Sequence, residues 1–418
     1  MRGALLLSAL GFALLSCEPG QQRVGVLAGE LPASTAASIE WRAPWVPELL
    51  GLGAEERVRG FDGEGLRLLR LVGEDARPEG FSPGVGFRSL GSRRWFQRSV
   101  QQLDSAEDFQ VELHADLGRS LVPMLNQLFQ ASEGGWGSKL STSFLGLESF
   151  LSAAVALRLE RLGDRVESVQ ADVYVQLARE PMGLVKALLL PAAKSRLGGA
   201  AQELPGRFAF LWARADLQRI LSQQRRSLAR QGGYFGEALR QVLGASLETL
   251  PFLREELLEA LGDEYLCFWP RLGNPLDPAQ SQLVVTVADP RALREAISRM
   301  EFDGFDGLVK QGSQKWEARL RLQGRSVGLV LEFGERSRLR LGPLAAVRKA
   351  LPKAATRRNL LAKPSESLAL FDLPLPAIGT VIRGGPKPMR PLLTGRARCS
   401  GSLSEQAGRM RLRLATHR

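Results

Sequence analysis

The stretch Leu283-Val-Val-Thr-Val-Ala-Asp289 is followed directly by Pro290-Arg-Ala-Leu-Arg-Glu-Ala-Ile297. Its first part is a short run of apolar and β-branched residues, which is typical of a buried strand. Asp289 can accept hydrogen bonds from the free amides at a helix start, and Pro290 suits the first helical position. The stretch therefore predicts a strand that ends near Asp289 and a helix that begins at Pro290.

The same order of apolar run, aspartate and helical spacing occurs elsewhere in the chain. The aspartates at these junctions are Asp116 and Asp216, with a looser copy at Asp372 and another looser copy over Val173–Pro181. Metal binding or acid chemistry is the alternative role, but one aspartate at each junction is what helix capping needs. We therefore predict an α+β fold of antiparallel sheets with packed helices, built from repeated strand–helix units.

Three C-terminal segments alternate between arginine and leucine, which predicts half-buried antiparallel strands with the leucines inside. The arginines on the outer faces are Arg319, Arg321, Arg338, Arg340, Arg409, Arg411 and Arg413. One interpretation is a solvated sheet face in an arginine-rich protein. The other is a surface that docks on phospholipid head groups, lipid-linked phosphates or acidic envelope polymer.

The net charge of +12 belongs to the C-terminal quarter of the chain. Residues 311–418 contain 22 Lys and Arg against 6 Asp and Glu, whereas the rest contains 34 basic and 38 acidic residues. This asymmetry favours an anionic partner for the C-terminal strands.

The N-terminus carries a short apolar run, Ala4–Leu15, that ends in Leu14-Leu15-Ser16-Cys17. A membrane-spanning helix needs roughly 20 apolar residues, and an ordinary export signal needs small residues in an A-x-A pattern. A small residue directly before a cysteine, with leucines upstream, resembles the lipobox of bacterial lipoproteins. An ordinary export signal with a chance cysteine is the alternative.

The lipobox resemblance implies a location. Residues 1–16 would be the signal peptide, Cys17 would carry the lipid, and residues 17–33 would form the lipidated cysteine and its tether. The protein would then be anchored to a membrane of the cell envelope through acylated Cys17. Because residue 18 is Glu rather than Asp, the outer membrane facing the periplasm is favoured, and the cell surface is the alternative.

The sequence predicts two modules after the tether, an N-terminal α+β module over 34–200 and a C-terminal α+β module with the basic antiparallel sheet over 201–418. Leu31-Pro32, Leu261-Gly-Asp-Glu264 and Val287-Ala-Asp-Pro-Arg-Ala-Leu293 are similar to motifs in a group of uncharacterised bacterial envelope proteins, known only as a domain of unknown function. The resemblance implies no activity and no site residues.

Sequence patterns for catalysis are weak. Of the two histidines, His114 lies within a predicted strand and is interpreted as structural, and His417 is next to the last residue. Gly80-Phe-Ser82-Pro-Gly84 has the spacing of a nucleophile elbow, but the strand which that motif needs does not precede it. Because the sequence has no phosphate-binding, zinc-helix or calcium-loop motif, we predict no catalytic residues, no metal and no cofactor. Cys267 and Cys399 are either a disulfide or two buried thiols.

These features together predict non-enzymatic binding of an anionic or amphiphilic envelope partner by a lipoprotein on a lipid bilayer. We predict no nucleic-acid partner, because the expected location is extracytoplasmic and the sequence has no recognition motif. The alternatives are an enzyme that acts on envelope material and a structural subunit of an envelope protein complex.

Overall fold

The structure is a computed structural model. It describes residues 31–41, 56–62, 68–72, 77–78, 89–103, 110–120, 146, 149–162, 165–181, 185–186, 189, 195–216, 218–219, 255–271, 273, 277, 279–300, 305–322, 325–334, 337–355, 358, 360–374, 397–406 and 409–417.

The chain divides into two compact units. Unit 1 is Met1–Met182 together with Pro374–Arg418, and unit 2 is Gly183–Leu373. This division differs from the predicted boundary at residue 200, because the C-terminal strands return to pair with an early strand of unit 1. The register places Arg413 opposite Asp172.

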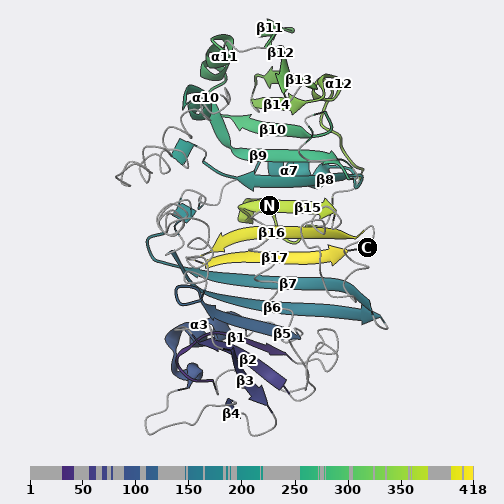
Figure 1. Ribbon diagram of the computed structural model, residues 1–418. Coiled ribbons are helices and arrows are strands. Elements are labelled where there is room, and N and C mark those ends of the chain that lie inside the picture. The colour runs from purple at the N-terminus through teal and green to yellow at the C-terminus, as the bar shows by residue number, and fades with distance from the viewer. Residues whose placement is uncertain are drawn as a thin grey trace. The chain divides into compact units, whose positions relative to one another are not determined.

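The described strands of unit 1 are all paired antiparallel, in the order β4-β3-β2-β1-β5-β6-β7-β17-β16 (Figure 1). Their bounds are β1 Thr35–Trp41, β2 Glu56–Asp62, β3 Leu68–Val72, β4 Arg77–Pro78, β5 Val111–Asp116, β6 Phe150–Leu162, β7 Arg165–Leu177, β16 Arg398–Gln406 and β17 Arg409–His417.

Side chains alternate between the two faces of this sheet. One face carries a cross-strand row of apolar residues, Ile39, Leu113, Val155 and Val173, which belongs to a buried cluster. On the other face lies helix α3 (Arg94–Leu103), preceded by the short helix η2 (Leu90–Ser92). Leu103 of α3 packs on the small side chains of β6, which leave room for a helix.

Unit 2 has its own antiparallel order, β15-β8-β9-β10-β14-β13-β12-β11 (Figure 1). The strand bounds are β8 Phe208–Arg214, β9 Leu261–Pro270, β10 Gln282–Val287, β11 Val309–Lys310, β12 Lys315–Leu322, β13 Arg325–Glu332, β14 Arg338–Gly342 and β15 Ala369–Pro374. The helices are α7 Leu197–Glu203, α10 Glu255–Ala260, α11 Pro290–Ser298, α12 Leu344–Val347 and η6 Pro364–Glu366.

Both faces of the unit 2 sheet are covered. Helices α10 and α11 pack over one face, where Leu257, Leu293 and Ile297 join the strand residues in a buried cluster. Helix α7 packs over the opposite face, where Leu197 and Ala201 meet a second buried cluster. The second face also carries the arginines of β12 and β14, and it is the face that holds the candidate site.

The predicted α+β fold of repeated strand–helix units is wrong. Every strand pair that the described residues form is antiparallel, the described helices are short, and the fold is β-rich. The predicted strand–helix order is present at β10 and α11, where Asp289 Oδ1 accepts hydrogen bonds from the amides of Arg291 and Ala292 at 2.9 and 3.0 Å.

The other aspartates explain the error. The carboxylates of Asp116 and Asp216 also accept a hydrogen bond from the amide three residues ahead. At Asp116, however, this bond belongs to a turn over residues 117–120. Asp372 lies inside β15, where it faces Phe210 of β8. A carboxylate that binds a nearby amide begins a turn as readily as a helix, so the motif does not by itself predict a helix.

Candidate functional site

Glu264 on β9 fixes helix α7 to the sheet of unit 2. This side chain is buried, and its carboxylate accepts hydrogen bonds from the amide of Leu197 at 2.6 Å, the amide of Arg196 at 2.9 Å and the hydroxyl of Ser195 at 3.1 Å. The first amides of a helix have no partner within the helix, and a negative charge is favourable there. A carboxylate from the sheet therefore sets the position of the helix start.

Thr286 on β10 lies next to this junction. The amide of Glu264 donates to Thr286 Oγ1 at 3.1 Å. A Cβ atom at Gly262 would lie 2.3 Å from the same oxygen, so only glycine lets the two strands approach in this way. Thr286 is thereby held as part of the floor between α7 and β14.

Arg340 and Gly328 hold the opposite wall. Arg340 on β14 is 1% exposed, and its guanidinium donates to the carbonyls of Lys349 at 2.5 Å and Ala346 at 3.3 Å, at the end of α12. Gly328 lies beneath α12, where a Cβ would come within 2.7 Å of Leu344 Cδ1. These contacts place the segment that follows α12 across the sheet from α7.

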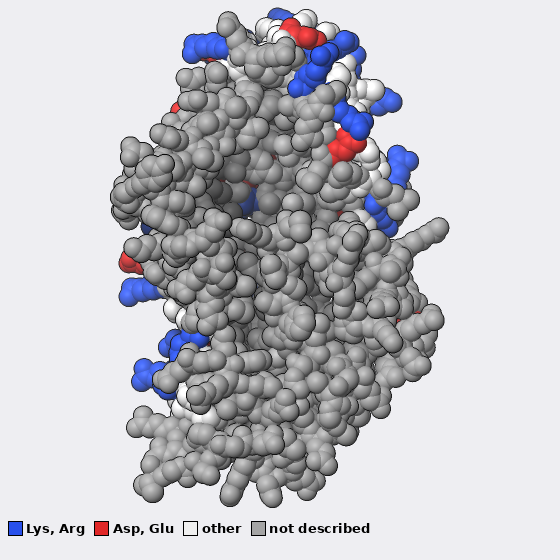
Figure 2. All heavy atoms as spheres, viewed as in Figure 1, with Lys and Arg blue, Asp and Glu red and all other residues white. Residues whose placement is uncertain are grey.

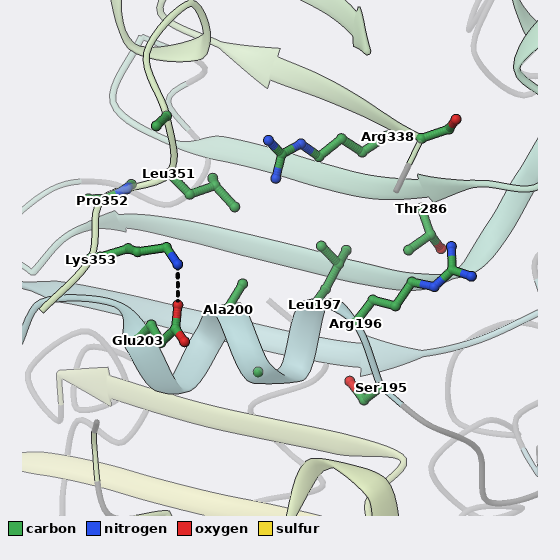
Figure 3. A pocket seen from close by; sticks show the side chains of 13 residues that line it. Ser195, Arg196, Leu197, Ala200, Glu203, Thr286, Arg338, Leu351, Pro352 and Lys353 are labelled. Carbon is green, nitrogen blue, oxygen red and sulfur yellow. Dashed lines mark ion pairs between the residues drawn. The ribbon is translucent and has the colours of Figure 1, made fainter. Parts of the chain in front are cut away.

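A cavity of about 900 Å³ lies between these two walls (Figure 3). It is lined by three basic side chains, one acidic side chain, three hydroxyl groups and several apolar groups. The described lining residues are Ser195, Arg196, Leu197, Gly199, Ala200, Glu203, Thr286, Ser337, Arg338, Ala350, Leu351, Pro352 and Lys353. Pockets for small ligands in proteins are usually about 300–1,000 Å³, so this cavity has the size of a ligand site.

The charges of the lining are unequal, with Arg196, Arg338 and Lys353 against Glu203. Lys353 Nζ pairs with Glu203 at 2.8 Å across the space between the segment 350–353 and α7, as Figure 3 shows. Arg338 Nε pairs with Glu332, which is not among the described lining residues. The lining therefore favours a negatively charged ligand.

The apolar part of the lining comes from Leu197 and Ala200 on α7 and from Leu351 and Pro352 on the facing segment. None of the described lining residues is aromatic. Nucleotide bases are usually bound by stacking on aromatic rings, whereas a hydrocarbon chain needs only apolar contact. A basic cavity with aliphatic walls suits an amphiphile with an anionic head group.

The structure separates the seven predicted arginines. Arg338 lines the cavity, and Arg340 is buried behind it, where burial lowers its pKa. Arg319 and Arg321 of β12 are exposed. In Figure 2, Lys and Arg side chains lie along the edge where Figure 1 places β11, β12 and β13. The four arginines of unit 2 therefore differ in environment: one lines the cavity, one is buried and two are exposed.

The other three arginines belong to β17 in unit 1. Arg409 is exposed. Arg411 pairs with Asp172 at 2.9 Å and lies 4.9 Å from the ring centre of Tyr174, and Arg413 lies 3.5 Å from the same carboxylate. Burial raises the pKa of Tyr174, and Arg411 opposes that effect. These contacts bind β17 to β7, so Arg411 and Arg413 have a structural role.

His114 lies in a buried polar group beneath α3. Ser99 Oγ is 2.9 Å from His114 Nδ1, and His114 Nε2 is 3.6 Å from Glu112 Oε2. A serine, a histidine and a carboxylate in this order resemble a catalytic relay. Ser99 and His114 are each 0% exposed, however, so the hydroxyl does not open to solvent. The contact between Ser99 and His114 joins α3 to β5.

The remaining candidates from the sequence are quickly placed. Cys267 and Cys399 are thiols and do not form a disulfide. Cys17 and Gly80–Gly84 lie outside the described residues, as does the side chain of His417.

Sequence reasoning missed most of the cavity. Arg196 and Glu203 lie at the two ends of α7, whereas Lys353 is 150 residues further along the chain, and the pairing of β10 with β14 brings Thr286 next to Arg338. One signal was present in the sequence. Glu264 is a carboxylate directly before the largely apolar run Tyr265–Trp269 of the same strand, and buried carboxylates require specific partners.

Among the described residues, no His, Cys, Asp and Glu side chains are grouped as a metal site would require. In the same part of the chain, no helix has the length and apolar character needed to cross a bilayer. Comparisons with models of protein families, with curated proteins and with solved structures found no match.

Proposed function

We propose that this protein is an envelope lipoprotein, anchored through Cys17, that binds an anionic amphiphile in the cavity of unit 2 without chemical conversion. The cavity between α7 and the segment 350–353 carries this proposal, because it combines three basic side chains with aliphatic walls. The anchor is supported by the lipobox resemblance at Leu14–Cys17.

Blocking the cavity tests the binding. The full chain is purified from its native membrane in mild detergent, and bound small molecules are extracted and identified by mass spectrometry. We expect an anionic amphiphile with the wild-type protein and at least a tenfold smaller amount with Ala200→Phe, because the phenyl ring fills space beside the lining of α7. Ala345→Phe is the matched control, since Ala345 is an exposed alanine on α12.

Two results would refute the binding proposal. The first is a wild-type protein that carries no anionic amphiphile. The second is an equal amount of the molecule on wild-type protein and on Ala200→Phe. The anchor is tested separately by the intact mass of the natively produced protein, which must exceed the mass of a chain that begins with an unmodified Cys17.

A second function, docking on an anionic bilayer, is favoured by one observation. Arg319 and Arg321 are exposed on β12, and the adjoining strand β11 exposes Val309 and Lys310. Each basic residue near an anionic membrane contributes about 1 kcal/mol, so replacing both arginines should weaken binding by roughly 30-fold. The test is co-sedimentation of the Arg319→Gln/Arg321→Gln protein with phosphatidylglycerol vesicles, and equal binding of both proteins would exclude this function.

A further inference from the structure

The guanidinium of Arg338 has one occupied edge and one open edge. Its Nε pairs with Glu332, and its two terminal nitrogens have no hydrogen-bond partner among the described residues. The side chain is 31% exposed, and it extends over the strands toward Leu351 in Figure 3. Two parallel N–H groups on one guanidinium are the geometry that binds carboxylate or phosphate with two hydrogen bonds.

Glu332 is shared between two guanidinium groups. Its Oε2 faces Arg338, and its Oε1 lies 3.7 Å from Nη1 of the buried Arg340. Arg338 and Thr286 are directly opposite each other on β14 and β10, and Glu332 faces Arg338 from β13. One carboxylate therefore serves two cations, Arg338 in the cavity lining and Arg340 buried behind it, and the local charge is positive.

Glu332 also acts against any anion that binds to Arg338, because two negative groups on one guanidinium repel each other. The buried side chain of Arg340 stays beside Glu332, and its charge holds the Glu332 carboxylate next to Arg338. The strength of anion binding then depends on how much of the charge of Arg338 is already neutralised by Glu332.

We infer that Arg338 is the head-group residue of the cavity, that it binds an oxyanion through its terminal nitrogens, and that Glu332 is an internal competitor that limits the affinity. This inference rests on the proposed function and adds to it the residue that contacts the head group and the residue that tunes the contact. The shared ligand chemistry is an oxyanion on an alkyl chain, and the test distinguishes phosphate from carboxylate.

The test measures binding of three short-chain probes to the full chain by calorimetry. The chain carries Cys17→Ser, so that detergent is not needed. Octyl phosphate and octanoate carry the two kinds of oxyanion, and octyl glucoside carries an uncharged head group on the same chain. We expect at least one of the anionic probes to bind at least tenfold more tightly than octyl glucoside, and the tighter anionic probe identifies the preferred head group.

Variants then assign the roles. Glu332→Gln should tighten binding of the preferred anion by about tenfold, since removing a nearby negative charge strengthens the field at Arg338. Arg338→Gln should weaken it by at least tenfold. Arg338→Lys keeps the charge but removes the forked geometry, and it should also weaken binding by about tenfold. Glu317→Gln is the matched control, because it makes the same change in net charge on the same sheet face beside Lys315 and Arg348.

The outcomes separate the two proposals. If the anions bind selectively but neither Glu332→Gln nor Arg338→Lys changes their affinity, the head-group inference is wrong and the proposed function stands. If Glu332→Gln and Glu317→Gln tighten binding equally, the effect is net charge alone and the inference is also wrong. If no probe binds the wild-type chain, the proposed function fails. Thermal unfolding of each variant checks that it is folded. If Glu332→Gln does not fold, the affinity of Arg338→Lys decides the inference.

Discussion

Oε2 of Glu264 accepts a hydrogen bond from the amide of Leu197 at 2.6 Å, although the two residues are 67 positions apart in the sequence. The same carboxylate oxygen lies 3.4 Å from Trp212 Nε1. A side chain from the middle of a strand thus does the work that a capping residue beside the helix usually does. Helix α7 is short, and this contact adds to the apolar packing of Leu197 and Ala201 that holds it on the sheet.

Glu264→Gln should destabilise the protein by about 1–3 kcal/mol, because an amide accepts fewer hydrogen bonds than a carboxylate and carries no charge at the helix start. Denaturant unfolding measures the change. Glu295→Gln is the control, since Glu295 is exposed on α11 and should change stability by less than about 0.5 kcal/mol. Equal stability of both variants would show that Glu264 does not hold α7.

Two glycines near the cavity should respond in opposite directions to the same substitution. Gly328→Ala should destabilise by about 1–3 kcal/mol, because its Cβ would come within 2.9 Å of the Leu344 Cα and of Val347 Cγ2. Gly199→Ala should stabilise by about 0.5–1 kcal/mol, because the position is inside α7 and nothing lies within 4 Å of the added Cβ. Thermal unfolding of the two variants checks the signs, and the same sign for both would contradict the described packing.

Arg358 and Asp372 form a buried pair whose closest atoms, Nη1 and Oδ2, are 2.5 Å apart. The guanidinium also donates to the carbonyls of Leu204, Pro205 and Phe208. Arg358→Met should destabilise by about 3–5 kcal/mol, because it removes the cation from beside a buried carboxylate. The double variant Arg358→Met/Asp372→Leu should recover part of this loss in denaturant unfolding. If the double variant loses more stability than Arg358→Met and Asp372→Leu lose together, the ion pair is not the cause of the loss.

Burial raises the pKa of Cys267 from 9.0 to about 11. The thiol is neutral in the fold, and in the unfolded chain it ionises at lower pH. Its contribution to stability is therefore complete below pH 9 and is lost as the pH rises from 9 to about 11. Cys267→Ala should show a smaller loss of stability between pH 8.5 and about 11 than the wild-type protein, as measured by urea unfolding. Identical pH profiles would show that the thiol does not ionise differently in the two states.

Sequence patterns predicted individual strands better than they predicted the arrangement. The alternation at Arg338–Leu341 and at Arg409–Leu414 predicted strands, and both segments are strands. The same alternation could not show which arginines are exposed, because that depends on what covers each face. Arg340 lies on the same face as Arg319 but is buried, since its guanidinium is covered at the end of α12.

The cavity could not be predicted from local sequence for a related reason. Its walls belong to α7, β10, β14 and the segment 350–353, and antiparallel pairing between distant strands brings them together. The arginine pattern did identify Arg338 as a candidate for anion binding. It could not identify Glu332 as its partner, because the register of β13 and β14 decides that contact.

The pairing of β17 with β7 has a consequence for how the protein matures. Arg411 and Asp172, which join these strands, are 239 residues apart in the sequence. A chain that emerges from its N-terminal end presents β7 long before β17 exists, so one border of unit 1 exposes unsatisfied amides and carbonyls throughout that delay. Unit 2, whose described strands lie within residues 208–374, can fold in the meantime. Unit 1 can therefore be completed only after β17 has emerged, and truncation of the last strands would leave the edge of β7 open to pairing with other chains.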